Sequence, residues 1–377
     1  DYMEQSALSE NIRRYMKLGG WTIPSLAQAA EISTTTLSNC LNDKSDPRIS
    51  IIQKIADKLG VSMAQMFAEK PSFDNFRFRS LYALTAKEKA FRENLLFLTY
   101  DKIQEYLNIE RFAEEKKTFT FINEKFDEPL AAAHIVRERV GLSQTAPILD
   151  ICELVSKLGV KLFYFDFKYN KTYGASVSAE DDGPAIILNS SIESVERKIF
   201  TIAHELGHIL LHKETFKSSE TMEEKNSEEE RDANVFAGEL LCPQDVVFEK
   251  VKDTHGFSFI DAVLKLKQMY KVSYGTVLHQ YCNKYGIPNQ YSAVTKKFQA
   301  MYANKNKISF RGHFEPFALN ESLYHFEDPF LRDMVVKLYQ NEKISSTKAA
   351  EILDWSKKSL EEWSCKIEGT SEKDLPF

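Results

Sequence analysis

The chain has 377 residues, 43% hydrophobic and 28% charged, which is long enough for two or three globular domains. Its net charge of −6 excludes a uniformly basic protein, so any contact with nucleic acid must come from a local patch. Five scattered cysteines without a C-x-x-C pair argue against a disulfide framework and favour a reducing compartment. The first residues lack the apolar segment of a secretory signal, and no apolar run approaches a membrane span. We therefore expect a cytoplasmic protein without membrane contact.

The N-terminal region, residues 8–67, carries the pattern of five short helices separated by polar turns. The first helix has an apolar stripe that begins with Leu8 and Ile12. The third helix, expected over residues 33–41, opens with Ser33, a favourable N-cap residue. In a helix-turn-helix domain this third helix would enter the DNA groove. A protein-interaction or dimerisation module would account for the same helices.

The expected recognition helix and the turn that follows it supply the candidate DNA contacts. Asn39 can pair with an adenine edge, and Lys44 and Arg48 can contact phosphate. Acidic and basic residues are about equally frequent over residues 1–70, which weakens the attraction to DNA. The candidate DNA-binding residues are Thr34, Thr35, Ser38, Asn39, Lys44 and Arg48.

Beyond the N-terminal helices the pattern becomes mixed. A charged amphipathic helix is expected over residues 85–115 and looks like a connector, and two further helices are expected over 131–140 and 148–158. Alternating β-branched and aromatic residues then predict a small sheet. Its strands are expected at residues 160–167, 172–178 and 185–189.

Two helices follow the expected strands. The first is predicted over residues 191–212, with a capping box at its start that runs from Ser190 to Glu193. The second is predicted over residues 228–241, because Pro243 then ends the helix. The polar segment between them, residues 213–227, is a candidate gate for a nearby cleft. Mostly helical sequence continues to about residue 285, and a helical pair is expected near 345–367.

The first of these helices contains the motif His204-Glu205-Leu206-Gly207-His208. Histidines four residues apart lie on one helix face, ~6 Å apart along the axis, and both rings can bind one ion at about 2.1 Å. A carboxylate next to the first histidine can accept a proton from water that zinc makes acidic. A surface helix with two unrelated histidines is the alternative. The apolar residues around the motif favour a buried helix, whose polar groups need partners.

A zinc enzyme needs a third protein ligand and one open position. His212 follows His208 by one turn, but a straight helix places it another ~6 Å along the axis, so it is better suited to support the ligands. Glu230, on the next helix, shares a helix face with Ala233 and Ala237 and would face the metal from there. A solvated residue at an acidic helix start is equally compatible with this spacing.

Two stretches of the sequence resemble the ImmA/IrrE family of zinc peptidases. They are GASVSAEDDGPAIILNSSIESVERKIFTIAHELGHILLH and EERDANVFAGELLCP, and the resemblance extends over about residues 126–288. The long E-x-x-A-N-x-F-A-x-x-L-L-x-P pattern implies that Glu230 is the third ligand, beside His204 and His208, with Glu205 as general base. The sequence departs from the pattern at Asp232, where many members have Glu, and at Cys242, where Met is common. Neither position belongs to the implied metal set.

The N-terminal region resembles an Xre-type helix-turn-helix domain, a frequent companion of this peptidase. The resemblance implies an α+β protein with a zincin-like (gluzincin) peptidase domain around a small sheet. It also implies a Zn²⁺ endopeptidase that cleaves a small DNA-binding repressor and so derepresses stress, defence or mobile-element genes. The expected parts are a helix-turn-helix domain at 1–70, a helical connector at 71–128, a peptidase domain at 129–290 and a helical C-terminal region at 291–377.

A competing function class is a DNA-binding transcription regulator whose peptidase fold serves as a docking or sensing module. The intact Glu205 favours the peptidase, because a docking module would not need a general base. The group that stabilises the oxyanion is open, with Tyr164 and Tyr173 as candidates.

Residues 295–314 mix basic side chains with the aromatic residues Phe298, Tyr302, Phe310 and Phe314. Aromatic rings can stack on bases while lysines neutralise phosphates, which makes single-stranded DNA a candidate activator. An amphipathic helix packed on the body of the protein explains the same residues. The candidate nucleic-acid-sensing residues are Lys296, Lys297, Lys305, Lys307 and Arg311.

Overall fold

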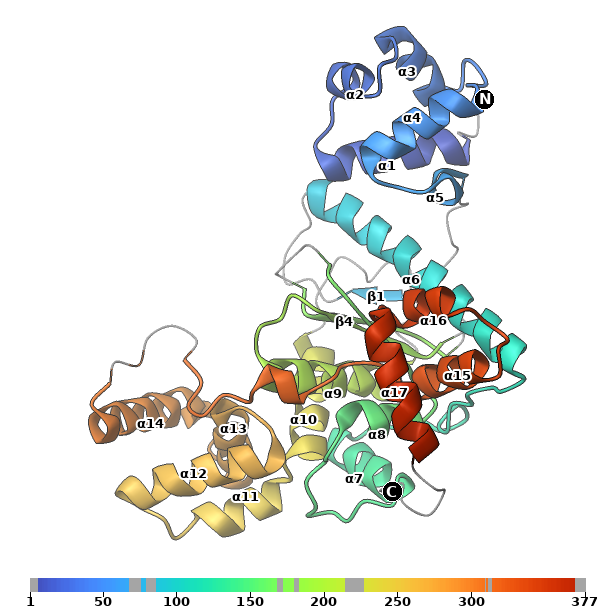
Figure 1. Ribbon diagram of the computed structural model, residues 1–377. Helices are drawn as coiled ribbons and strands as arrows, with labels where there is room; N and C mark the ends of the chain where they lie inside the picture. Colours follow the sequence, from blue (N-terminus) through green and yellow to red (C-terminus); the bar gives the residue numbers. More distant parts are fainter. Residues whose placement is uncertain are drawn as a thin grey trace. The chain divides into compact units, whose positions relative to one another are not determined.

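The computed structural model describes residues 6–67, 76–78, 86–167, 172–179, 183–213, 227–308, 310 and 314–369. The chain divides into two compact units, which are considered separately below (Figure 1). Unit 1 comprises Asp1–Phe73 and Ser80–Lys102, and unit 2 comprises Asp74–Arg79 and Ile103–Phe377. Within the described residues, no helix is long and apolar enough to cross a membrane.

Unit 1 begins with the five predicted helices. They are α1 (Ala7–Gly19), α2 (Ile23–Ala29), α3 (Thr34–Leu41), α4 (Ile49–Leu59) and α5 (Met63–Phe67). The Ser33 hydroxyl accepts the Thr36 amide at 2.9 Å and caps α3, as its sequence position predicts. Gly60 ends α4 in the left-handed conformation, with φ of 70°. Buried apolar side chains from all five helices form one small core.

Unit 2 contains a four-stranded sheet in the order β1-β3-β4-β2. Its strands are β1 (Phe76–Phe78), β2 (Lys161–Phe165), β3 (Gly174–Val177) and β4 (Ala185–Asn189). β4 pairs in parallel with β2 and antiparallel with β3, and β1 pairs antiparallel with β3. The three predicted strands are present. β1 was not predicted, because three residues are too few to show an alternating pattern.

The sheet packs against α9 (Val195–Leu211), and α10 (Ser227–Leu241) lies alongside α9 (Figure 1). The predicted start of α9 is wrong. Ser194, not Ser190, is the N-cap residue, and its hydroxyl accepts the Arg197 amide at 3.3 Å. Ser191 instead donates to the Asn189 side chain and belongs to the turn after β4. Local side-chain bonding thus shifts the helix start by one turn.

A glycine allows α9 and α10 to approach closely. A Cβ atom at Gly207 would lie 3.0 Å from the Phe236 ring and 3.2 Å from the Ala233 backbone. On its other side α10 is tied to α7 (Pro129–Arg139), because the buried Arg137 guanidinium donates to the carbonyl oxygen of Leu240. Small residues and a buried cation thereby fix the position of α10 relative to α9.

Unit 2 contains further helices on either side of this centre. They are α8 (Ile151–Lys157), α11 (Gln244–Val251), α12 (Gly256–Tyr270), α13 (Tyr274–Lys284), α14 (Tyr291–Asn306), α15 (Pro329–Gln340), α16 (Ser346–Leu353) and α17 (Lys357–Gly369), with short 3₁₀ helices at Pro288–Gln290 and Glu321–Leu323. The long helix α6 (Ala86–Ala113), which belongs to unit 1 up to Lys102, corresponds to the helix expected over residues 85–115. One continuous core contains side chains from α7 to α14 and extends to Phe326.

A buried ion pair joins distant parts of unit 2. Lys117 Nζ lies 2.8 Å from Asp328 Oδ1, and both side chains are almost fully buried. Burial lowers the pKa of Lys117, and the Asp328 carboxylate opposes that shift. Asp328 also accepts the Leu162 amide and caps α15. This single carboxylate therefore links the connector, the sheet and the C-terminal helices.

Candidate metal centre

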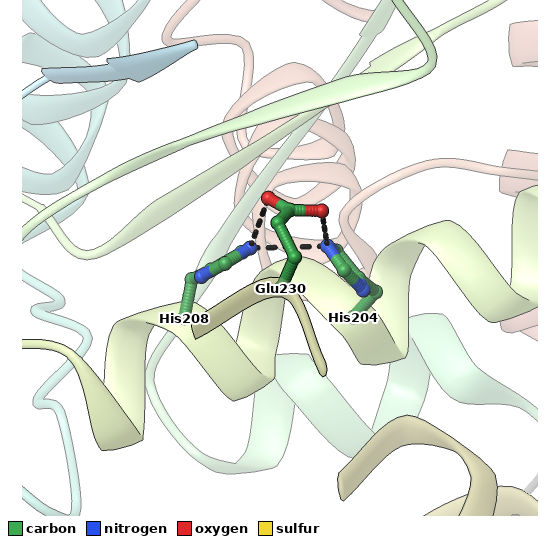
Figure 2. Close-up of side chains that lie close together, drawn as sticks. All are labelled: His204, His208 and Glu230. Carbon is green, nitrogen blue, oxygen red and sulfur yellow. Dashed lines mark hydrogen bonds and ion pairs between the residues drawn. The ribbon is translucent and has the colours of Figure 1, made fainter. Parts of the chain in front are cut away.

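Three predicted ligands converge where α9 and α10 lie side by side. The Nε2 atoms of His204 and His208 are 3.0 Å apart. Glu230 reaches across from α10, with one carboxylate oxygen 3.7 Å from His204 Nε2 and the other 3.3 Å from His208 Nε2 (Figure 2). All the potential ligand atoms lie within 4.8 Å of one another. The helix spacing and the interhelical packing thus bring the three side chains to one point.

These separations fit a single tetrahedral ion. A four-coordinate zinc with bonds of about 2.1 Å holds its ligand atoms about 3.4 Å apart. The three observed separations, 3.0, 3.3 and 3.7 Å, scatter around that value. Two imidazoles and one carboxylate also form a donor set of catalytic zinc sites, in which one position stays open. The residues present therefore suit a divalent metal.

Neighbouring side chains orient both imidazoles. His204 Nδ1 lies 3.0 Å from the side-chain oxygen of Asn234, which can only accept a hydrogen bond. That bond places the proton of His204 on Nδ1 and leaves Nε2 with a lone pair directed at the centre. His208 Nδ1 lies 3.0 Å from His212 Nδ1. His212 therefore supports His208 from the side remote from Glu230.

Glu205 is held by strand β3. Its Oε2 atom accepts a hydrogen bond of 2.8 Å from the Ser176 hydroxyl. A Cβ atom at Gly174 would lie 3.2 Å from Glu205 and 2.7 Å from the Thr201 side chain, so only glycine allows the strand to approach α9 this closely. The glutamate is 2% exposed, and its carboxylate is positioned by the sheet as well as by its own helix.

The buried cysteines do not contribute to this centre. Cys40, Cys152, Cys242 and Cys282 are buried, and burial raises the pKa of each thiol. Their thiolates, which are the metal-binding and nucleophilic form, are thereby suppressed at neutral pH. Among the described residues, the group suited to hold a metal consists of two histidines and one glutamate.

The candidate DNA-binding residues lie on α3 and in the turn after it. Thr34 and Thr35 are exposed at the start of the helix, and Ser38 and Asn39 are half-buried. Lys44 and Arg48 are exposed beyond its C-terminal end. The exposed helix start and the two cations therefore remain available for a partner, whereas Ser38 also contacts the Asn42 side chain.

The basic segment at residues 295–314 differs from the expectation that its aromatic rings stack on bases. Phe298 and Tyr302 are buried on α14, where Phe298 stacks on Tyr274 with ring centroids 5.0 Å apart. The base-stacking role considered for these two rings is therefore wrong, because they are core residues. The lysines considered with them are exposed at Lys296, Lys297, Lys305 and Lys307, and Arg311 lies outside the described residues.

The two candidate oxyanion donors have other partners in this structure. The Tyr164 hydroxyl accepts a hydrogen bond from Lys198 at 2.8 Å, and Lys198 also pairs with Glu321. The Tyr173 ring packs under the guanidinium of Arg197, 4.9 Å from the ring centroid. Nearly all of the candidate gate at 213–227 lies outside the described residues, with Lys213 bonded to the carbonyl oxygen of Phe121.

Two residues of the centre were missed by the sequence reasoning. Asn234 follows Glu230 by four residues, so helix spacing alone would have placed it on the same face. Ser176 carries no comparable signal, because it precedes Glu205 by 29 positions on a separate strand. Only the packing of β3 against α9 brings it to the carboxylate.

Comparisons with known families agree with this arrangement. Residues 155–281 match the family model of the IrrE N-terminal-like domain, peptidase M78, a metallopeptidase family. Residues 12–66 match a helix-turn-helix model. The two matches confirm the resemblance to the ImmA/IrrE architecture and the predicted α+β class with an all-α N-terminal domain. No curated protein matches the chain at a significant level.

Proposed function

We propose that this chain, with a peptidase M78 domain that follows a helix-turn-helix domain, is a cytoplasmic zinc endopeptidase that cleaves a DNA-binding repressor. The observation that carries the proposal is the convergence of His204, His208 and Glu230 beside a strand-held Glu205. Cleavage of the repressor would derepress stress, defence or mobile-element genes, as the family resemblance implies.

The donor set supports zinc as the metal. Two neutral imidazoles and one carboxylate suit this borderline ion, and the spacing suits four-coordination with an open position. Zinc at this position would supply Lewis-acid chemistry, which makes water acidic and polarises a carbonyl group. His204 and His208 would hold it through Nε2, because the Nδ1 atoms face Asn234 and His212.

Glu205 is the proposed general base. Its carboxylate would accept a proton from the attacking water and then deliver it to the leaving amine. The Ser176 hydroxyl stabilises the charged carboxylate and fixes its rotamer, so that the second oxygen can receive the proton. Burial excludes bulk water, which strengthens each of these interactions.

The replacement Glu205→Gln tests the enzymatic proposal. The amide is isosteric and cannot accept the proton, so we expect unchanged zinc content and loss of cleavage by at least ~10²-fold. Wild type and variant would be incubated with a candidate DNA-binding repressor, and the products identified by mass spectrometry. Cleavage by the variant at a rate near that of wild type would refute the assignment of the base.

A second candidate function is transcription regulation without cleavage, with the peptidase fold as a docking or sensing module. The match over residues 12–66 favours DNA binding by the N-terminal domain, through Thr34, Thr35 and Asn39 on α3 and the cations that follow. This activity is compatible with cleavage. Regulation without cleavage would be the function only if the wild-type chain binds its operator and cleaves no partner.

Duplex DNA binding can be measured on the full chain by fluorescence anisotropy. We expect weak binding that falls steeply with salt, because phosphate contacts by Lys44 and Arg48 release counterions. Replacing both by Gln should lower the salt slope by about 2, or about 1 per lost phosphate contact. Absence of binding even at low salt would favour the protein-interaction reading of this domain.

We also propose that single-stranded DNA activates cleavage through the lysines at Lys296, Lys297 and Lys305 of α14 and at Lys307, its C-cap residue. Burial of Phe298 and Tyr302 removes two of the four aromatic rings from base stacking, whereas Phe310 is half-buried and Phe314 is exposed. The expected activation is therefore modest and salt-sensitive.

A further inference from the structure

The edge of the sheet nearest the metal centre is occupied by a short strand from another part of the chain. β1, residues 76–78, pairs with β3 although the two strands are about a hundred positions apart in the sequence. We propose that β1 occupies the edge along which an extended peptide substrate binds, and so competes with substrate in cis. The proposal rests on the proposed endopeptidase function and adds a regulatory element to the same site.

The first step is that β3 is part of the reaction centre. Ser176 donates to Glu205, and Gly174 packs on the same glutamate. A peptide that adds to the outer edge of β3 would therefore run one strand spacing, about 4.8 Å, from residues that touch the general base. β3 packs directly against α9, so a peptide backbone paired with β3 lies close to the catalytic carboxylate.

The second step is the register of the present occupant. Phe76 pairs with Val177, Arg77 with Ser176, and Phe78 with Ala175. Arg77 thus lies opposite the residue that positions Glu205. The backbone of β1 takes the place that an incoming peptide would take on this edge.

The third step is the kind of partner that fits. The edge of β3 offers backbone amides and carbonyls, which recognise an extended backbone through main-chain hydrogen bonds whatever its sequence. Gly174, Ala175 and Ser176 are small, which leaves the edge accessible to large side chains of a partner. The partner is therefore an extended, unfolded segment of protein, such as a loop or linker of the substrate.

The fourth step is the balance between the two occupants. His204 is fully buried and Glu205 is 2% exposed, so a substrate reaches them only when a neighbouring segment moves. β1 is three residues long, near the lower limit for a strand, and makes few ladder bonds. A substrate strand that pairs over more residues can displace it, whereas a short or folded segment cannot.

The test weakens β1 without touching the centre. The amides of successive residues in a strand point alternately toward and away from the neighbouring strand. Of Arg77 and Phe78, one therefore donates toward β3, and the double replacement Arg77→Pro/Phe78→Pro removes that donor. The matched control is Arg77→Lys/Phe78→Tyr, which keeps both amides. Amide hydrogen exchange of the full chain should rise over residues 174–177 in the proline variant only.

The functional readout is cleavage of fluorescein-labelled casein, an unfolded protein probe, by zinc-loaded enzyme. We expect the proline variant to cleave about tenfold faster than wild type, which corresponds to ~1.4 kcal/mol of lost competition. A synthetic peptide of residues 74–80 added in trans should inhibit the proline variant more strongly than wild type. The control variant should behave like wild type in both assays.

Three outcomes separate the explanations. Faster exchange with unchanged cleavage would overturn the proposal and leave β1 as a cover for an exposed edge. Unchanged exchange would overturn the pairing itself. If neither wild type nor the proline variant cleaves, the competition is tested by peptide binding instead. A fluorescently labelled 74–80 peptide is titrated with each protein, and its anisotropy measures binding. Tighter binding to the proline variant supports the competition and places the failure in the proposed peptidase activity, whereas equal binding refutes it.

Discussion

Helices α9 and α14 were both selected from the sequence for chemistry, yet they are built in opposite ways. On α9 the functional polar groups are buried, and contacts from a strand and a second helix fix them. On α14 the lysines are exposed, and the aromatic residues between them are buried in the core. A motif with fixed spacing on one helix face constrains geometry, whereas a mixture of residue types in a segment does not reveal which of them face solvent.

The largest expected effect in this comparison is loss of the metal. His208→Ala removes one of three ligands, so we expect zinc to be lost on dialysis, with less than a tenth of an equivalent retained. Elemental analysis of the purified chain measures this directly. Full zinc retention in the variant would remove His208 from the ligand set.

Phe298→Ala tests whether the aromatic residues of α14 belong to the hydrophobic core. The side chain is fully buried and stacks on Tyr274, so its truncation should lower the free energy of unfolding by about 3–5 kcal/mol. Urea unfolding followed by near-UV signal gives the value. The exposed neighbour Lys297→Ala serves as the control, with a change within about 0.5 kcal/mol. A loss below about 1 kcal/mol for Phe298→Ala would contradict the placement of this ring in the core.

A smaller effect is expected when the orientation of a ligand is lost. Asn234→Ala removes the acceptor for His204 Nδ1 and should weaken zinc binding about 10–100-fold. Asn234→Asp keeps an acceptor and should bind zinc close to wild type. Competition with a chromophoric chelator measures both affinities. Equal affinities for the alanine variant and wild type would mean that the helix alone orients the ring.

The smallest effect on the folded protein is expected from reversing the charges of α14. Replacing Lys296, Lys297, Lys305 and Lys307 with Glu should leave the zinc content unchanged and lower the stability only slightly, because surface charges contribute little even where Lys305 pairs with Asp261. Stimulation of cleavage by single-stranded oligonucleotides should disappear. Stimulation equal to that of wild type, or full activity without oligonucleotide, would make this surface a packing face only.

Much of the fold could be predicted because its signals are local. Most helix caps, the alternating strands and the His-x-x-x-His spacing each act within a few residues, and the placement of His204, Glu205 and His208 on one helix follows from them. Glu230 required the resemblance, since its spacing was compatible with solvent. Ser176 and β1 were not predictable, because their roles depend on pairing and packing with residues far along the chain.

The Lys117–Asp328 pair has a consequence for how the chain is made. The two residues are 211 positions apart, so the ammonium group emerges from the ribosome long before its carboxylate. At about 5–20 residues per second the delay is ~10–40 s. Throughout that interval the Lys117 ammonium group lacks the carboxylate that it pairs with in the folded protein. A chaperone that shields unfinished chains can act during this interval, and a ribosome stalled before residue 328 would release a chain without this buried ion pair.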